Sequence, residues 1–291
     1  MVRSGVLCRL RRYCSLSLVA RMDITPDSIW ADFRTLRETT PLVLSLTNSV
    51  VREFTANALL ALGASPIMSD AFEEISELVG VASALNLNIG TPTPRSAEAM
   101  ALGAAAAKAR GIPIALDPVA VGATQIRRKL VDRLLSIATP TAIRGNQAEI
   151  AALAGLSSVA KGVDAVGNLE QAPAVVRQLA KQIGTVVVAS GATDYLSDGN
   201  TVIAIENGHP LMARTTGSGC VATAVVAAFL GVSSPPLSAA ISAMVVMDVA
   251  GELAADHSRT EGPGSFRVRF LDAFDKLEPE QIEQRMKLNT L

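Results

Sequence analysis

Aromatic residues, cysteines and excess charge are all scarce in this sequence of 291 residues. Only 3% of the residues are aromatic although 49% are hydrophobic, so the core has to be built from Ala, Val, Leu and Ile. The 26 Lys and Arg residues nearly balance the 27 Asp and Glu residues, and the net charge of −1 provides no basic surface for a nucleic acid. This composition is typical of buried parallel strands covered by Ala-rich helices.

Long uninterrupted apolar runs are also missing. None reaches the length that a membrane span requires, and the most apolar segments, "VATAVVAAFLGV" and "LSAAISAMVVMDVAGELAA", are predicted to be buried helices. No linker, low-complexity segment or internal repeat follows residue 22. We therefore predict one domain over residues 22–291, a length that suits a single large α/β domain.

The first 21 residues differ from the rest of the chain. They contain five arginines, several serines and no acid, which is typical of an organelle transit peptide. The alternative is that Met22 is the true start and that the upstream residues are a mis-called extension. Without this segment, Cys220 is the single cysteine, so no internal disulfide forms and we expect a reducing, cytoplasmic location, with organelle import left open.

Strand-like apolar runs alternate with helical patterns along the chain. The runs at 41–47, 84–90, 112–118, 141–146 and 184–191 are predicted strands. "DYLSDGNTVIAIENG" is predicted to form a hairpin, and the chain from 217 to 256 is predicted to be mostly helical. Strands that alternate with helices indicate βαβ units and a parallel sheet with right-handed crossovers.

Polar clusters follow five of the predicted strands. They are "TNS", "NIGTPTP", "DPVAVGAT", "RGNQAE" and "SGATD". One such cluster is usually a cap or a turn, but the carboxyl ends of parallel strands share one sheet edge, where open α/β sheets bind ligands. We therefore predict a ligand site at this edge.

The motif "TTGSGC" has the composition of an anion-binding turn. Gly217 and Gly219 permit backbone conformations closed to other residues and a close approach by a ligand. The apolar helix that follows would direct free N–H groups and a partial positive charge toward an anion such as a transferring phosphoryl group. The simpler alternative is a glycine turn that only begins a helix.

Two acids and one arginine accompany these strand ends. Asp117 ends one predicted strand and Glu149 opens the helix after another, positions from which carboxylates hold Mg²⁺ through its waters. Glu149 is alternatively an ordinary first-turn helix acid. Arg144, directly after a strand, is placed to clamp a phosphate.

The ordered set of motifs resembles the hydroxyethylthiazole kinase family. In chain order the motifs are "SLTNSVVREFTANALLALGASPIM", "LNIGT", "LDPVAVGATQIRRKL", "AIRGNQAEIAALAG", "KGVDA", "TTGSGC" and "GPGSF". The resemblance implies the ribokinase-like fold, a three-layer α/β/α arrangement around a central, mostly parallel sheet. It also implies phosphorylation of the alcohol of 4-methyl-5-(2-hydroxyethyl)thiazole with ATP and Mg²⁺, in thiamine biosynthesis or salvage, by a homotrimer with active sites between subunits.

The resemblance further implies roles for individual positions. It assigns substrate binding to Met68, Gly217 and Asn48, ATP binding to Arg144, Ser190 and Asn146, support of magnesium to Asp117 and Glu149, and catalysis to Cys220, Gly217 and Gly219. Because active sites lie between subunits in the family, Met68 is expected to serve the site of a neighbouring copy.

Cys220 stands where most ribokinase-like kinases have the Asp that takes the proton of the alcohol, as it does in the thiazole kinases. An unperturbed thiol is mostly protonated at neutral pH, although a helix N-terminus would favour the thiolate. Phosphoryl transfer depends mainly on positioning and charge stabilisation. We therefore expect Cys220 to orient the hydroxyl and to accept its proton at most; the alternative is a buried cysteine without a chemical role.

Three departures from the family pattern bear on the substrate. Leu44 replaces a frequent His, Ser49 a second Asn and Glu53 another Asn, and all three are expected near the thiazole. The alternatives are therefore a hydrated-nicotinamide-nucleotide dehydratase, a kinase for hydroxymethylpyrimidine or pyridoxal, and a catalytically silent nucleotide-binding relative. The first two are disfavoured by Cys220, and the third by the presence of the acids and glycines.

Overall fold

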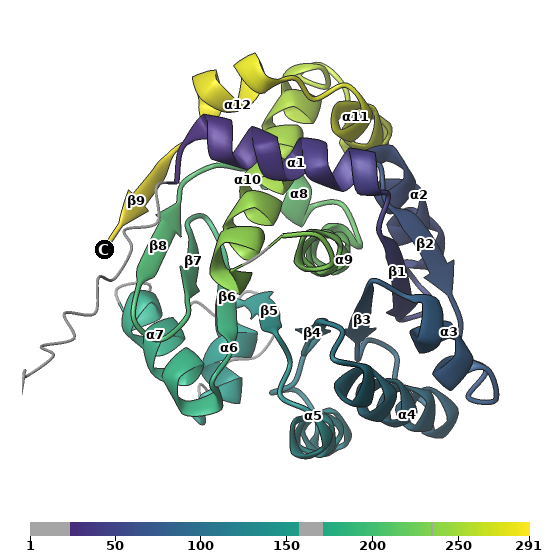
Figure 1. The fold of residues 1–291 in the computed structure, drawn as a ribbon. Helices are drawn as coiled ribbons and strands as arrows, with labels where there is room; N and C mark the ends of the chain where they lie inside the picture. Colours follow the sequence, from purple (N-terminus) through teal and green to yellow (C-terminus); the bar gives the residue numbers. More distant parts are fainter. Residues whose placement is uncertain (1–23, 157–170, 234) are drawn as a thin grey trace, which may run out of the picture.

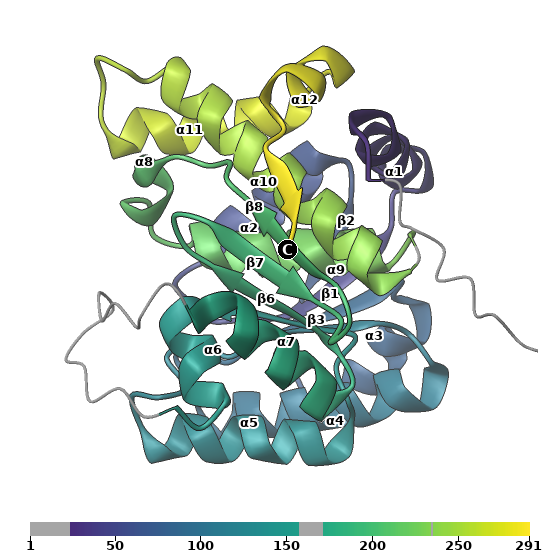
Figure 2. The same ribbon diagram turned by 90° about the vertical axis from the view of Figure 1, so that its left-hand side faces the viewer.

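The structure is a computed structural model that describes residues 24–156, 171–233 and 235–291 (Figure 1). The extension predicted over residues 1–21 and the "KGVDA" motif at 161–165 lie outside the described residues. The described chain forms one central sheet with helices on both faces (Figure 2). This is the predicted three-layer α/β/α arrangement.

The sheet has nine strands among the described residues, in the spatial order β2-β1-β3-β4-β5-β6-β7-β8-β9. The first six in this order run parallel and the last three pair antiparallel. The strands are β1 (Leu42–Leu46), β2 (Ser65–Met68), β3 (Ala84–Asn88), β4 (Ile114–Asp117), β5 (Ala142–Asn146), β6 (Val186–Ser190), β7 (Asp194–Ser197), β8 (Val202–Ile205) and β9 (Leu288–Thr290). All the predicted strands and the β7–β8 hairpin are confirmed; β2 and β9, which close the two edges, had no counterpart among the predicted strands.

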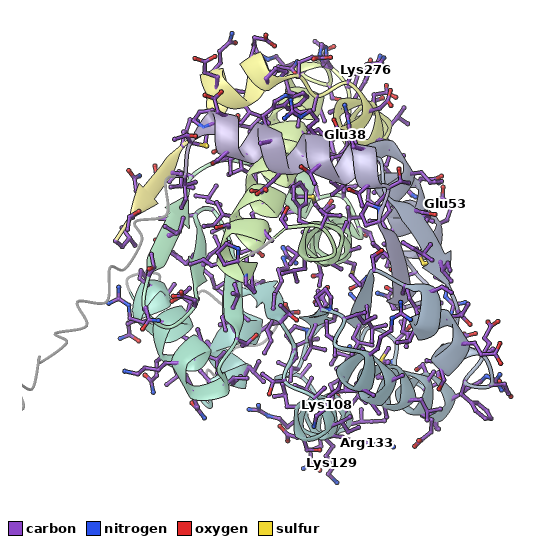
Figure 3. The ribbon with its side chains drawn as sticks, viewed as in Figure 1. Glu38, Glu53, Lys108, Lys129, Arg133 and Lys276 are labelled. Carbon is purple, nitrogen blue, oxygen red and sulfur yellow. The ribbon has the colours of Figure 1, made fainter. Side chains whose placement is uncertain are left out.

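Helices cover the two faces of the sheet (Figure 2). On one face lie α1 (Pro26–Thr39), α2 (Arg52–Leu62), α8 (Pro210–Ala213), α9 (Ser218–Leu230), α10 (Pro236–Asp256), α11 (Pro263–Asp275) and α12 (Pro279–Arg285). On the other lie α3 (Ile75–Val81), α4 (Pro94–Arg110), α5 (Gln125–Ile137), α6 (Gln147–Leu153) and α7 (Ala172–Ile183). The charged residues labelled in Figure 3 all lie at the periphery of these layers.

α9 and α10 form the centre of one apolar layer. Both helices are apolar around their whole circumference, which is the pattern of helices enclosed on every side. Among the described helices, α10 is the one long and apolar enough to cross a membrane by length and composition, but 89% of its most apolar window is buried inside the fold. The prediction of two buried core helices is confirmed.

Candidate active site

The carboxyl ends of five adjacent parallel strands bring polar side chains together at one edge of the sheet. β1, β3, β4, β5 and β6 are consecutive in the sheet order. Their registers pair Asn88 with Asp117 and Asn146 with Ser190, and Asn48 lies two residues beyond the end of β1. The predicted clustering at one sheet edge is therefore confirmed.

The turn that precedes α9 lies against this edge. Gly217 is the N-cap of α9 with φ +95°, a left-handed conformation that favours glycine, and a Cβ at this position would lie 2.9 Å from Cγ1 of Val51. No side chain caps the helix. The backbone N–H groups of Gly219 and Cys220 have no acceptor among the described residues, so two donors remain for an anion.

Gly219 requires a correction. It lies in the first turn of α9 without a positive φ, so the expectation that it needs a special backbone conformation is wrong. A Cβ there would lie 2.9 Å from Nη1 of Arg144. Glycine at this position leaves space for the guanidinium, which donates a hydrogen bond of 2.9 Å to the carbonyl oxygen of Gly219 itself.

Arg144 links the turn to the end of β6. It lies within β5 rather than after it, with only 9% of its surface exposed. Its Nη2 donates to Oγ of Ser190 at 2.6 Å, while its Nε is buried without an acceptor. The guanidinium makes no ion pair with a carboxylate of the described residues, so one donor of a buried cation remains unsatisfied.

Asp117 is the most enclosed acid of this edge, with 2% of its surface exposed. Its Oδ2 accepts hydrogen bonds from Nδ2 of Asn88 at 2.7 Å and from Oγ1 of Thr223 at 3.1 Å. Burial raises the pKa of Asp117 to about 7, and the negative charge of Glu149 adds to this shift, while Arg144 opposes it. A cation at this edge would stabilise the ionised form of Asp117.

Glu149 has the structural role that the sequence left open. Its Oε2 accepts from the backbone N–H of Asn146 at 2.8 Å, and Oδ1 of Asn146 accepts from the N–H of Glu149, which forms a capping box at the start of α6. Its Oε1 accepts from the N–H of Ala120 at 2.7 Å. Within the described ranges, no group of three or more His, Cys, Asp or Glu residues could hold a metal ion. Two acids alone fit an Mg²⁺ ion that keeps most of its waters.

The environment of Cys220 opposes the thiolate. Its Sγ accepts a hydrogen bond from Nδ2 of Asn48 at 3.5 Å. Burial and the negative charge of Asp117 nevertheless raise the pKa of Cys220 to about 11. Burial therefore opposes the thiolate, which the helix N-terminus was expected to favour. The thiol is protonated at neutral pH.

Asn88 and Thr223 complete the site, and the sequence did not single them out. Oδ1 of Asn88 accepts from Nδ2 of Asn48 at 2.9 Å and from the N–H of Gly90 at 3.0 Å, while its amide donates to Asp117. A continuous hydrogen-bonded chain therefore joins the Cys220 end to the Asp117 end. An asparagine in a buried strand was the available signal, since such a side chain needs partners.

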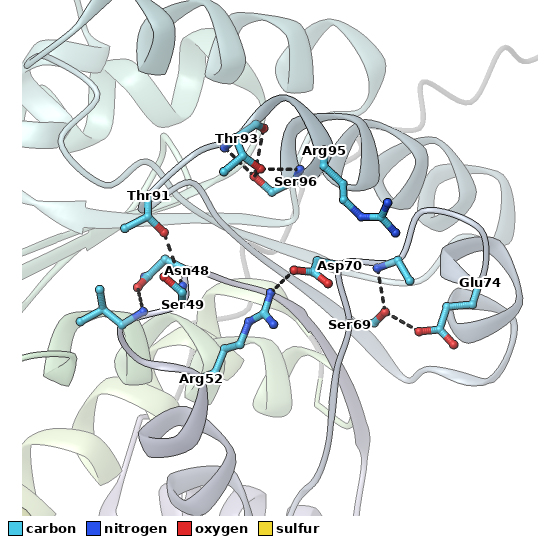
Figure 4. A network of polar contacts seen from close by, with 12 residues as sticks. Asn48, Ser49, Arg52, Ser69, Asp70, Glu74, Thr91, Thr93, Arg95 and Ser96 are labelled. Carbon is cyan, nitrogen blue, oxygen red and sulfur yellow. Dashed lines mark hydrogen bonds and ion pairs between the residues drawn. The ribbon is translucent and has the colours of Figure 1, made fainter.

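Met68 lies at the carboxyl end of the edge strand β2, opposite Ser45 in the register. It is half-buried and packs against the apolar layer that includes α2, and no hydrogen bond joins it to the site described above. Polar contacts surround this end of the sheet, including the ion pair of Arg52 with Asp70 and the hydrogen bond from the N–H of Ser49 to Oγ1 of Thr91 (Figure 4). A role for Met68 in a neighbouring copy stays a prediction.

The departures from the family pattern have different surroundings. Leu44 is fully buried in the layer on the α3–α7 face, so the expectation that it lies near the substrate is wrong. Glu53 is exposed and pairs with Arg267 at 2.6 Å. Ser49 is exposed next to Asn48 and remains the departure closest to the site.

The comparisons with known proteins agree on one family. The profile described as "HK: Hydroxyethylthiazole kinase family" matches residues 33–280. A protein of Syntrophus aciditrophicus (strain SB) named hydroxyethylthiazole kinase is 46% identical over 268 residues, which are 92% of this chain and 98% of that protein. One of the same name from Akkermansia muciniphila is 46% identical over 266 residues, 91% of this chain and 97% of that protein.

Solved structures show the same fold. The structure of a hydroxyethylthiazole kinase protein from Pyrococcus horikoshii OT3 matches with a TM-score of 0.84 and 37% identity, over 91% of this chain and 99% of that one. The pyridoxal kinase from Staphylococcus aureus in complex with AMP-PCP and pyridoxal matches with a TM-score of 0.60 and 15% identity, over 86% of this chain and 98% of that one. At this identity the second likeness shows the fold alone.

Proposed function

The chain belongs to the hydroxyethylthiazole kinase family, and from this premise we propose that it transfers the γ-phosphoryl group of ATP to the hydroxyl of 4-methyl-5-(2-hydroxyethyl)thiazole. The product is a phosphate ester that serves thiamine biosynthesis or salvage. The contact between Arg144 and Gly219 carries this proposal, because it places a buried guanidinium beside two free backbone N–H groups. Both kinds of donor stabilise charge on a phosphoryl group in transfer.

The nucleotide is assigned to the β5–β6 side of the site. Arg144 offers its unsatisfied Nε to a phosphate oxygen, and Ser190 holds the guanidinium through its hydrogen bond to Nη2. Asn146 uses Oδ1 to cap α6, which leaves its side-chain N–H groups for the nucleotide. The N–H groups of Gly219 and Cys220 then face the group that is transferred.

Magnesium is assigned to Asp117 and Glu149. Burial and the negative charge of Glu149 raise the pKa of Asp117, and this supports the assignment, because a divalent cation would stabilise the ionised form. When bound, the ion neutralises charge on the phosphates. Glu149 also keeps the loop at Ala120 in place through its hydrogen bond to that N–H group.

The alcohol is assigned to the β1 side, next to Asn48 and Cys220. The oxygen of the alcohol forms a bond to the γ-phosphorus while the bond from that phosphorus to the β–γ bridging oxygen breaks. The proton of the alcohol passes to an oxygen of the transferred phosphoryl group and from there to water. Because the Cys220 thiol is protonated at neutral pH, it orients the hydroxyl by hydrogen bonding rather than removing the proton before attack. Such a transition state needs little help from a base.

The assembly is proposed as a homotrimer with active sites between copies, as the family resemblance implies. In support, Met68 lies on an edge strand, and the apolar side chains of Val50 and Leu60, before and within α2, are exposed. Mass measurement by light scattering tests this state. One domain over residues 22–291 and a cytoplasmic location likewise remain proposals.

The decisive experiment measures ADP release from ATP with a panel of alcohols. We expect turnover with the thiazole alcohol and a mass increase of its product by one phosphate. Turnover only with hydroxymethylpyrimidine or pyridoxal would move the substrate assignment. ATP binding without turnover on any alcohol would favour a silent relative, and ATP-dependent dehydration of hydrated NADH would favour the dehydratase.

A further inference from the structure

Two buried acids outside the proposed mechanism contact each other beside the nucleotide side of the site. Asp194, at the start of β7, has 5% of its surface exposed, and Asp248, in the middle of α10, has 4%. Their carboxyl groups are within hydrogen-bonding contact. They come from elements that lie 54 positions apart in the sequence, so the contact exists only in the folded chain.

The contact requires a proton. Oδ1 of Asp194 accepts from the N–H of Gly191 at 2.8 Å, in the turn that follows Ser190, but Oδ2 of Asp248 is buried without any donor from the described residues. Two ionised carboxylates cannot share an apolar site at this range, whereas one proton held between them forms a strong hydrogen bond. Burial raises the pKa of Asp194 to about 6 and that of Asp248 well above its usual range, with the neighbouring acid adding to the shift of Asp248.

The charged groups around the pair come from several elements. Arg144 on β5 lowers the pKa of both acids. Glu252, one turn along α10 from Asp248, acts in the opposite direction, and its own carboxylate is held by Arg285 at 3.6 Å and by Lys287 at 3.9 Å. α8, which packs on α10, contributes two titratable side chains, both at its caps: His209 at the N-cap and Arg214 at the C-cap.

Arg144 is therefore the positively charged side chain whose electrostatic influence reaches both Asp194 and Asp248. Its guanidinium is buried without an ion pair, so its positive charge must be compensated by acids farther than contact distance. It lies within electrostatic range of two such acid pairs, Asp117 with Glu149 on one side and Asp194 with Asp248 on the other. A countercharge that does not touch the guanidinium leaves its donors available for a phosphate.

We propose that Asp194 and Asp248 share one proton and act together as a single negative countercharge that keeps Arg144 in place and free for a nucleotide phosphate. Both are positioning residues, since neither contacts the transferred group. The inference rests on the proposed function, in that Arg144 is taken to bind the nucleotide. Its consequence is a dependence on pH: when the shared proton leaves, a second negative charge appears beside the phosphate site and weakens ATP binding.

The test compares the ATP dissociation constant of the wild type and of Asp248→Asn by calorimetry at pH 6.5 and pH 9.5, without the alcohol. An amide in place of the protonated carboxyl keeps the hydrogen bond to Asp194 but cannot acquire the second charge. We expect the ratio of the wild-type constant to the variant constant to rise on the order of tenfold between these pH values. Asp256→Asn changes a half-buried acid at the end of the same helix, which pairs with Arg259 and Arg285; it is the control and should follow the wild type.

A ratio that does not change with pH would overturn the proposal. If Asp248→Asn fails to fold, Asp194→Asn provides the same comparison, because it too preserves one carboxyl and one amide. The proposed function fails separately: a wild type that binds ATP with the expected pH dependence but phosphorylates no alcohol refutes the kinase assignment and leaves the acid pair intact.

Discussion

Alanine substitutions at the two glycines where α9 begins should have different effects: one should lower the stability of the fold and the other should weaken ATP binding. The reason is that the two glycines are required for different purposes. At Gly217 the backbone has φ +95°, and alanine would also place a Cβ 2.9 Å from Val51 and 3.1 Å from Phe54. The left-handed conformation costs about 1–2 kcal/mol and the overpacking about 1–3 kcal/mol. Gly217→Ala should therefore lower the free energy of unfolding by roughly 2–5 kcal/mol, a fall in Tm of roughly 5–15 °C for a domain of this size.

At Gly219 the backbone is helical and the Cβ would meet only the end of a flexible side chain, Nη1 of Arg144. The guanidinium can withdraw, so the fold should keep its stability, while Arg144 loses its hydrogen bond to the Gly219 carbonyl oxygen. A displaced guanidinium also loses its proposed hydrogen bond to a phosphate oxygen of ATP, and hydrogen bonds of charged groups are worth about 1.5–3 kcal/mol. Gly219→Ala should therefore raise the KM for ATP by roughly 10- to 100-fold with little change in Tm.

Thermal melting and a coupled ADP-release assay on the same preparations provide the comparison. Gly264→Ala is the matched control, because Gly264 also occupies the second position of a helix, α11, and nothing lies within 4 Å of its Cβ position. This control should retain both its Tm and its KM. A Gly219→Ala protein that melts as low as Gly217→Ala, or that keeps the wild-type KM for ATP, would refute the reasoning about Arg144.

Three further predictions concern the alcohol end and the buried acids. Cys220→Ser should lower kcat by less than about 100-fold and leave the KM for ATP intact in steady-state assays, because a protonated thiol is not the base. A larger loss of kcat would indicate that Cys220 removes the proton of the alcohol. Asn88→Ala should cost about 1–3 kcal/mol of stability and lower kcat, measured by melting and turnover, since it leaves buried partners unsatisfied; wild-type values would contradict this. Burial raises the pKa of Asp117 to about 7 and that of Asp194 to about 6, so their contribution to stability is complete below about pH 4 and is lost as pH rises through 6–7. The apoprotein should melt at a higher temperature at pH 5.5 than at pH 8, and the reverse order would show these acids to be ionised without cost.

The sequence predicted the layers and the edge of the sheet where the polar residues meet. Alternating apolar runs and Ala-rich helices depend on local periodicity, which survives in any context. β2 is harder to detect, because it has four residues, one of them proline, and pairs with a single neighbour. The start of α6 could also be predicted from the sequence, since Asn146 and Glu149 have the spacing of a capping box.

The site was only half predictable. Asp117 and Arg144 could be placed at one edge from their positions at the ends of strands, and Gly217 in the turn before a helix, where the expected left-handed backbone is confirmed. Gly219 is required because a side chain there would overlap the guanidinium of Arg144, 75 positions away in the sequence, and not because of its backbone conformation. Leu44, which the family pattern connects with the substrate, is buried in the core.

By itself, then, the sequence determined the α/β layers, the family, and the sheet edge at which Asp117, Arg144 and Ser190 converge. These features could be predicted because hydrophobic periodicity and the order of strands and helices depend on short segments of the sequence. Only the tertiary structure decided the protonation of Cys220, the isolation of the Arg144 charge and the pairing of Asp194 with Asp248. Those properties depend on burial and on distances between segments remote in sequence, since desolvation and Coulomb interactions act through space rather than along the chain.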